Sequence, residues 1–201
     1  MIAIIDYGAG NLNSIQKALE YIGQKTVIIN SAEKEDVDKY NGLVLPGVGA
    51  FPGAMGRLKN NNFLPFIREF VDSGKPFLGI CLGMQLLFEW GYEDKKTPGL
   101  GLLSGEVVRI SSDYKIPHMG WNQLKILKDD PLFADLPENP HFYFVHSYQL
   151  SELTDDTEAV VEYGVEIPAV VRKKNIIGLQ FHPEKSGDNG IQMLKNFGEM
   201  L

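Results

Sequence analysis

Cys81 is the only cysteine of the chain and its strongest candidate for a nucleophile. A short apolar run, Phe77–Ile80, precedes it, and Leu82–Trp90 follows it with apolar residues at helical spacing. Gly79 and Gly83 complete a Gly-x-Cys-x-Gly pattern, which is typical of a nucleophile elbow. In such an elbow a sharp strand-to-helix turn exposes the nucleophile, and the positive end of the helix dipole favours the reactive thiolate. On this pattern alone, a buried and inert cysteine remains the alternative.

A nucleophilic cysteine needs a base, and the base needs a group that orients it. The chain has four histidines: His118, His141, His146 and His182. His182 ends an apolar, strand-like run, Ile176–Phe181, and Glu184 follows two residues later. We therefore predict a triad of Cys81, His182 and Glu184, in which the carboxylate holds the imidazole in one tautomer. His146, at the end of an aromatic run, is the second candidate for the base.

Short apolar runs in the first half of the chain predict strands, and they alternate with segments of helical spacing. The expected strands are 2–5, 26–30, 42–45 and 77–80, and the expected helices are 15–22, 63–71 and 82–90. We expect Asn13 or Ser14 to cap the first of these helices. The alternation predicts an α/β fold, a doubly wound and largely parallel sheet flanked by helices, whose sites form at the C-terminal ends of the strands.

Two glycine-rich turns follow expected strands. Gly8-Ala9-Gly10 lacks the third glycine of a dinucleotide fingerprint, because Asn13 stands there, and we interpret it as a tight strand-to-helix turn. The segment Pro46–Gly53 has too many glycines for a helix and too many prolines for a strand. Its backbone N–H groups are unhindered, so it is either half of an oxyanion hole or a flexible connector.

Helical periodicity weakens between Gly99 and Ala169, where short strands separated by turns are predicted. They cover 107–110, 123–127, 142–145, 159–163 and 169–172. We expect them to form an antiparallel extension of the sheet, within one domain that spans residues 1–201. A last helix is expected from Asn189 to Phe197.

The bulk composition excludes several classes of function. The net charge of −7 argues against nucleic acid and against an anionic membrane surface as partners. A single cysteine excludes an internal disulfide framework and suits a reducing cytoplasm, and the histidines are too scattered for a metal site. The segment Met1–Asp6 turns acidic too early for a signal peptide, and no apolar run reaches membrane-spanning length.

Three motifs together carry a resemblance to a known family. Pro46–Gly49, Gly79–Gln85 and Phe181–Glu184 are similar, in this order, to the three signatures of the class I (triad) glutamine amidotransferases, whose fold is flavodoxin-like. The similarity runs from residue 2 nearly to the C-terminus. Finer motifs resemble one branch of the family, which supplies ammonia for imidazole glycerol phosphate synthesis: Asp6–Leu12, Pro117–Asn122, Tyr143–Tyr148 and His182–Ser186.

The resemblance implies hydrolysis of the side-chain amide of L-glutamine to glutamate and ammonia, without a cofactor. Cys81 would attack the amide carbon, His182 would transfer protons, and Glu184 would orient His182. For the oxyanion hole, elbow geometry points to the N–H of Leu82, with a second N–H from Val48 or Gly49. The residues implied in glutamine binding are Gln85, Gly49, Ser147, Tyr148 and Glu93. From the residues alone, Gln85 could equally be a solvated helix residue and Tyr148 a core residue.

The resemblance also implies a partner, a (β/α)8-barrel cyclase that receives the ammonia through an internal channel in a heterodimer. Asn11, Trp121 and Lys185 match positions at that subunit interface. Trp121 stands in a loop-like stretch beside Gly120 and Asn122, which suits an exposed interface anchor, although a buried tryptophan is as consistent with the sequence.

Three other functions remain alternatives. A triad glutaminase for pyridoxal phosphate or anthranilate synthesis conflicts with Asp6–Leu12 and Pro117–Asn122. A cysteine hydrolase of the deglycase or peptidase kind conflicts with Gln85 and the Pro46–Gly49 loop. A regulatory domain that kept only the fold conflicts with an intact Cys81, His182 and Glu184.

Overall fold

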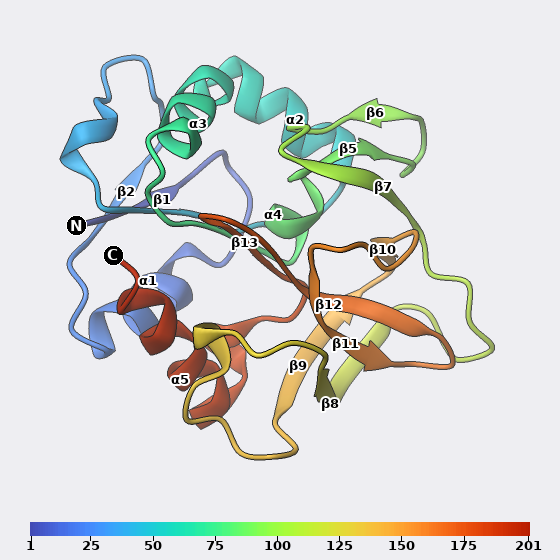
Figure 1. Ribbon diagram of the computed structural model, residues 1–201. Helices are drawn as coiled ribbons and strands as arrows, with labels where there is room; N and C mark the ends of the chain where they lie inside the picture. Colours follow the sequence, from blue (N-terminus) through green and yellow to red (C-terminus); the bar gives the residue numbers. More distant parts are fainter.

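A nine-stranded sheet forms the centre of the computed structural model, which describes residues 1–201 (Figure 1). Its strands lie in the order β2-β1-β3-β4-β13-β12-β11-β8-β9. The first five run parallel: β2 (Thr26–Ile29), β1 (Ile2–Ile5), β3 (Gly42–Leu45), β4 (Phe77–Ile80) and β13 (Ile176–Leu179). The other four are antiparallel to their neighbours: β12 (Glu166–Lys173), β11 (Thr157–Glu162), β8 (His118–Ile126) and β9 (His141–His146). The predicted fold class, with its antiparallel extension, is confirmed.

Helices cover both faces of this sheet (Figure 1). On one face lie α1 (Leu12–Tyr21) and α5 (Gly187–Gly198); on the other lie α2 (Phe51–Asn60), α3 (Phe63–Asp72) and α4 (Leu82–Gln85). Short 3-10 turns occur at η1 (Val37–Lys39), η2 (Pro131–Phe133) and η3 (Pro183–Lys185). No helix has the length and apolar character needed to cross a membrane.

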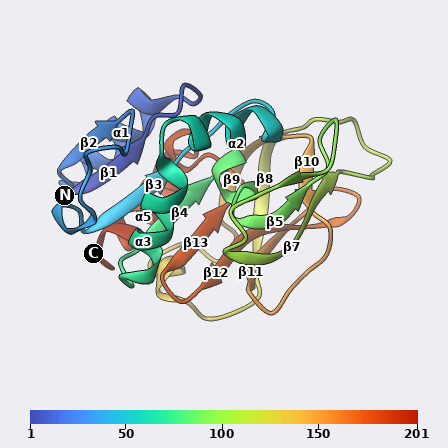
Figure 2. The same ribbon diagram turned by 90° about the horizontal axis from the view of Figure 1, so that it is seen from above.

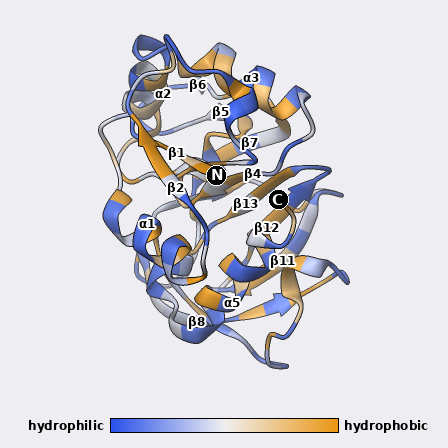
Figure 3. Cartoon of the chain, turned by 90° about the vertical axis from the view of Figure 1, so that its left-hand side faces the viewer, coloured by the Kyte–Doolittle hydropathy of each residue, from blue (hydrophilic) through white to orange (hydrophobic).

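Four parallel strands, β1, β3, β4 and β13, are buried along their whole length, so both of their faces carry apolar residues or glycine. In β1, Ala3 and Ile5 pack under α2 and α3, whereas Ile2 and Ile4 pack under α1 and α5. Figure 3 shows the resulting pattern, with hydrophobic colours along the central strands and mixed colours along the helices that surround them. The two cores therefore lie on opposite faces of one sheet, whose rigid strand ends can position a site.

A second, four-stranded sheet extends the layer of α2 and α3 (Figure 2). Its strands are β10 (Tyr148–Leu150), β7 (Leu103–Arg109), β5 (Phe88–Gly91) and β6 (Thr97–Pro98), in that order. The strand predicted at 107–110 therefore belongs to this small sheet and does not extend the large one. Phe88, Leu103 and Leu150 join the small sheet to the core beneath α2 and α3.

The helix expected over Leu82–Trp90 is wrong beyond its first turn. It ends at Gln85, and the chain re-enters as β5, where Phe88 pairs in parallel with Leu103. Leu86, Leu87 and Phe88 are all buried, so their helix-like spacing reflects burial on every side. Packing and strand pairing outweigh the weak helical preference of these residues.

Two other expectations about helices are corrected. Pro46–Gly53 is expected from its composition to contain no helix, but α2 begins at Phe51, because Pro52 suits the first turn of a helix and Phe51 is anchored in the core. The first helix begins at Leu12, ahead of the caps expected at Asn13 and Ser14, and Asn11 precedes it without a side-chain cap bond.

Gly83→Ala is expected to destabilise the fold, because a Cβ at this position would lie 1.8 Å from the carbonyl oxygen of Leu45. Backbone on both sides prevents relaxation, so we expect a loss of about 3 kcal/mol or more in the free energy of unfolding. Gly56→Ala in α2 is the matched control, since a Cβ there meets nothing within 4 Å. The control is expected to gain about 0.5–1 kcal/mol. Urea unfolding measures both, and equal midpoints would contradict this account.

Candidate active site

Cys81 stands at a strained turn between β4 and α4. Its φ of 55° and ψ of −111° lie outside the conformations that ordinary residues prefer. The backbone is held there by its N–H, which donates to the Leu179 carbonyl at 2.7 Å. The turn presses its two ends together, and a Cβ on Gly79 would lie 2.7 Å from the Gly83 oxygen. The Gly-x-Cys-x-Gly pattern thus allows this strand-to-helix turn and leaves the sulfur at the helix N-terminus.

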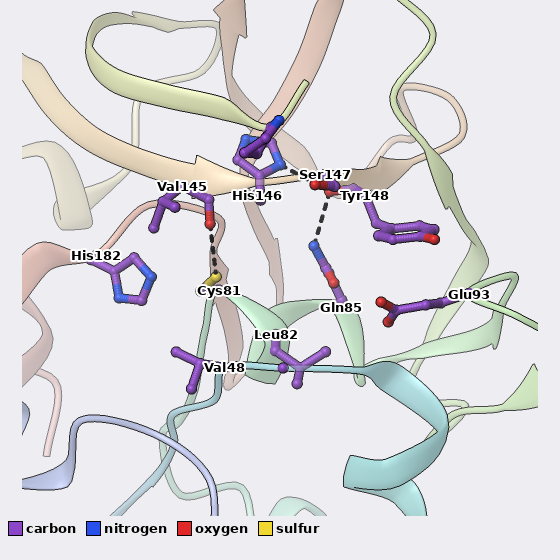
Figure 4. Close-up of a pocket in the computed structure, with 12 residues that line it drawn as sticks. Val48, Cys81, Leu82, Gln85, Glu93, Val145, His146, Ser147, Tyr148 and His182 are labelled. Atoms are coloured by element: carbon purple, nitrogen blue, oxygen red, sulfur yellow. Dashed lines mark hydrogen bonds between the residues drawn. The ribbon is translucent and has the colours of Figure 1, made fainter. Parts of the chain in front are cut away.

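His182 and Glu184 form a buried pair beside the cysteine. His182 Nδ1 lies 2.9 Å from Glu184 Oε1, and both side chains are 5% exposed. Nε2 of His182 is buried without a hydrogen-bond partner, and the imidazole lies next to Cys81 (Figure 4). The backbone N–H of His182 donates to the Tyr143 carbonyl, so β9 helps to fix the base. The fold thus brings together the three residues predicted as a triad.

The pKa values of the two buried histidines of the site, His182 and His146, are shifted in opposite directions. Burial disfavours the imidazolium of His182, but Cys81 and Glu184 outweigh burial and raise the pKa of His182 to about 10. Burial lowers the pKa of His146 to about 3, although the Tyr148 carbonyl opposes this shift. His146 is also engaged at both nitrogens, by Tyr148 O at 2.9 Å and by His118 Nδ1 at 3.0 Å. His182 is therefore the base that the geometry favours over His146.

A cavity of about 370 Å³ opens onto the sulfur. Its wall holds every residue that was predicted to bind glutamine or an oxyanion: Val48, Gly49, Leu82, Gln85, Glu93, Ser147 and Tyr148. Leu82 is the first residue of α4, so its N–H has no partner within the helix. Gly49 has a φ of 98° and open space around its α-carbon. The loop at Val48 and Gly49 and the start of α4 thus line the same cavity as the sulfur, and two such backbone segments can supply the donors of an oxyanion hole.

The polar side chains of this wall are already held by the protein. Gln85 is buried, not solvated, and its Nε2 donates to Tyr148 O at 2.9 Å. Glu93 Oε2 accepts from the N–H of Phe51 at 2.7 Å, which ties the carboxylate to the start of α2. Tyr148 is half-buried, with its ring on the side of Glu93 (Figure 4), so it is not a core residue.

Sequence reasoning missed several residues at the site. Gln180 is fully buried, and its Nε2 lies 3.9 Å from the Cys81 sulfur. Val145 O lies 3.9 Å from the same sulfur, and Pro117 lines the cavity. A signal for Gln180 was present, because it is the one uncharged polar side chain inside the apolar run Ile176–Phe181. Val145 approaches the sulfur through its backbone carbonyl, which leaves no mark in the sequence.

The three residues predicted at a subunit interface are exposed on the outside of the site. Trp121 is 56% exposed, so it is not the buried tryptophan of the alternative interpretation. Lys185 is exposed next to Glu184, and exposed Asn11 lines a small cavity with His182 and Glu184. Trp121 also lies close to Gly187, which brings β8 near the turn that carries Lys185.

Comparison with known proteins shows the family to which this chain belongs. The model of the family "Glutamine amidotransferase class-I" matches residues 3–200. The subunit HisH of imidazole glycerol phosphate synthase from Lactococcus lactis is 54% identical over 201 residues, which is 100% of this chain and 98% of that protein. HisH from Caldanaerobacter subterraneus is 50% identical over 202 residues, with the same coverage of both chains. The chain belongs to the class I glutamine amidotransferase family. Its relatives place it in the HisH branch, as the finer motifs predicted.

Solved structures share the fold of this amidotransferase at low sequence identity. PurLQS from Thermotoga maritima has a TM-score of 0.78 at 21% identity, covering 98% of this chain and 97% of that one. A glutamine amidotransferase from the same organism has a TM-score of 0.65 at 17% identity, covering 98% of this chain and 82% of that one. At such low sequence identity, these likenesses support the fold of the chain and nothing about its activity.

Glu184→Gln is expected to lower the pKa of His182 below its value of about 10, because it keeps a hydrogen-bond acceptor and removes the charge. The pKa of His182 should fall by roughly one pH unit or more. Titration of the imidazole by ¹⁵N NMR measures it, with Glu199→Gln, an exposed glutamate just past the end of α5, as control. An unchanged titration would show that Glu184 does not hold the imidazolium.

The loss of stability caused by Glu184→Gln is expected to depend on pH. Folding raises the pKa of His182 above its ordinary 6.5, so the imidazolium contributes fully to stability below about pH 6.5. This contribution is lost as the pH rises toward about 10. The destabilisation by Glu184→Gln should therefore be larger near neutral pH than in alkaline buffer.

Proposed function

We propose that this chain is the glutaminase subunit of an imidazole glycerol phosphate synthase. It hydrolyses glutamine to glutamate and ammonia, and the ammonia passes to a cyclase subunit. The observation that carries the proposal is the strained cysteine, facing an unpartnered Nε2 of His182 at the wall of a cavity of about 370 Å³. Relatives that are 50% and 54% identical over the whole chain carry the name of that synthase subunit. The single cysteine suits a reducing compartment, so the proposal places the reaction in the cytoplasm.

The first half of the reaction forms a thioester. The Cys81 sulfur attacks the amide carbon of glutamine, a C–S bond forms, and the electron pair of the C=O bond moves onto oxygen. Leu82 N–H and a backbone N–H of Val48 or Gly49 stabilise this oxyanion, and one such donor is typically worth about 10²- to 10³-fold in rate. His182 gives its Nε2 proton to the amide nitrogen. The C–N bond then breaks and ammonia leaves.

The second half hydrolyses the thioester. Neutral His182 takes a proton from water through Nε2, and the water oxygen attacks the thioester carbon. The same backbone donors hold the second oxyanion. The C–S bond breaks, glutamate leaves, and the sulfur departs as a thiolate beside a protonated His182. Glu184 keeps Nδ1 protonated throughout, so Nε2 is the nitrogen that transfers protons.

The cavity wall suits the amino-acid end of glutamine. Glu93 offers a carboxylate to the ammonium group of the substrate, and the backbone at Gly49, Ser147 and Tyr148 binds the rest of that end. The amide nitrogen of Gln85 is already used by Tyr148 O and by Gln180 Oε1. Only the oxygen of Gln85 is therefore free to accept a hydrogen bond from the substrate.

The proposed cyclase partner, a (β/α)8-barrel, docks on the outer side of the site. Exposed Trp121 and Met119 on β8 give this surface an apolar character, and Lys185 adds a charge close to Glu184. Asn11 completes the surface at the start of α1. Because Lys185 directly follows Glu184, a partner bound here can influence the triad through the η3 turn.

Glutamate release tests the function. We expect the chain, when mixed with the cyclase partner and its ribotide ligand, to release glutamate much faster than the chain alone, with Cys81→Ala inactive in every mixture. Full activity that is the same with and without the partner would still support a glutaminase but would contradict the assignment to this synthase. Activity that survives in Cys81→Ala would contradict the mechanism.

Trp121→Ala is expected to weaken binding of the cyclase partner by about 30-fold, the effect of losing an aromatic hot spot. Tyr21→Ala is the matched control, because Tyr21 is 80% exposed at the opposite end of α1 from Asn11. Isothermal titration calorimetry gives both dissociation constants. Equal affinities for the two variants would place the interface elsewhere.

A further inference from the structure

Gln180 is a buried amide in contact with the nucleophile, and the reaction proposed for this chain does not use it. It follows β13 directly, has no exposed surface, and its backbone N–H donates to the Ala169 carbonyl at 2.9 Å. Its side-chain Nε2 lies 3.9 Å from the sulfur of Cys81, and its Oε1 lies 3.0 Å from Nε2 of Gln85.

The hydrogen bonds around Gln180 fix which end of its amide faces the sulfur. The Tyr148 carbonyl can only accept, so the group that faces it at 2.9 Å must be the NH₂ of Gln85. The same NH₂ faces Gln180 at 3.0 Å, so that atom of Gln180 must be its carbonyl oxygen. The NH₂ group of Gln180 is then the group that faces the sulfur.

The Tyr148 carbonyl, on which this orientation depends, is itself held in place. His146 Nδ1 lies 2.9 Å from it, so the carbonyl accepts from both His146 and Gln85. His146 and Gln85 are both buried, as is Gln180. The orientation of the Gln180 amide is therefore imposed by a network of buried groups that hydrogen-bond one another.

We infer, building on the glutaminase chemistry proposed for this chain, that Gln180 is a further residue of the catalytic machinery, which donates a side-chain N–H to the sulfur of Cys81. The sulfur carries negative charge twice, before it attacks the amide and when the C–S bond of the thioester breaks. A fixed N–H donor stabilises both states, and hydrogen bonds to ions are roughly twice as strong as those between neutral groups. The donor also aims the sulfur at the cavity.

In addition to the Gln180 amide, several charged and titratable groups lie around the sulfur and influence its reactivity. His182 and Glu184 approach after β13, His146 comes from β9, Tyr7 follows β1, and Glu93 lies across the cavity. Because none of these groups is itself replaced in a Gln180 variant, a comparison with the native chain reports on the change at residue 180.

Alkylation of Cys81 by iodoacetamide, followed against pH, tests the contact in the full chain. The chain has a single cysteine, so the rate reports on this sulfur alone. Gln180→Glu keeps an acceptor for Gln85 but loses the N–H, and Gln180→Met removes the amide at similar size without adding charge. We expect both to shift the pH–rate midpoint upward and to slow alkylation below it by about 10- to 100-fold, the effect of losing a hydrogen bond to an ion. Gln192→Glu on α5 is the control and is expected to match the native chain.

A second readout separates this role from a merely structural one. With the cyclase partner and its ligand present, both Gln180 variants should lose kcat while KM for glutamine stays near its native value. If alkylation is slower only in Gln180→Glu, the cause is repulsion by the added carboxylate, and the inference is overturned. Unchanged pH–rate profiles in both variants would also overturn it. If the native chain releases no glutamate but both variants alkylate slowly, the glutaminase proposal fails while the Gln180 contact stands.

Discussion

The whole site depends on one strained residue. Cys81 can adopt a φ of 55° only because glycines on both sides let β4 turn at once into α4, with no room for a Cβ against Leu45 or against the turn itself. Such strain costs about 1–3 kcal/mol, and it persists because the buried sheet determines where both ends of the turn lie. The sulfur is thereby placed at a helix N-terminus and at the edge of the parallel sheet, where the other site residues gather.

The parallel half of the sheet supplies the nucleophile and the base, and the antiparallel half supplies the walls. β13 lies next to β4, so His182 emerges beside Cys81 although the two residues are far apart in the chain. β9 then holds the backbone of His182 through Tyr143 and carries His146 to the cavity, where Ser147 and the first residue of β10, Tyr148, follow it. The small sheet brings Glu93 to the start of α2. The site thus forms where the two halves of the large sheet meet the small sheet.

Two histidines in the same cavity acquire opposite roles from their surroundings. Both are buried, which by itself makes an imidazole less basic. His182 has a carboxylate and a thiol as neighbours, and its pKa is raised, whereas His146 has another histidine and a carbonyl, and its pKa is lowered. A protonated His182 and a neutral His146 at neutral pH allow the first to transfer protons and the second to hold Tyr148. The same network reaches through Gln85 to Gln180 and so to the sulfur.

The sequence predicted the fold class, the elbow and a candidate triad, with His146 left open as a second base, because these predictions depend on local patterns. Glycines flank a cysteine at a strand end, Glu184 lies two residues from His182, and strands alternate with helices. It did not determine that Phe88 starts a strand of a second sheet, because its burial arises from long-range pairing with β7 that periodicity does not record. It also missed α2, whose glycines obscured a helix that a core phenylalanine anchors. Only the tertiary structure decided which histidine faces the sulfur, which end of Gln180 does so, and that Trp121 is exposed, because each of these depends on contacts between residues distant in the chain.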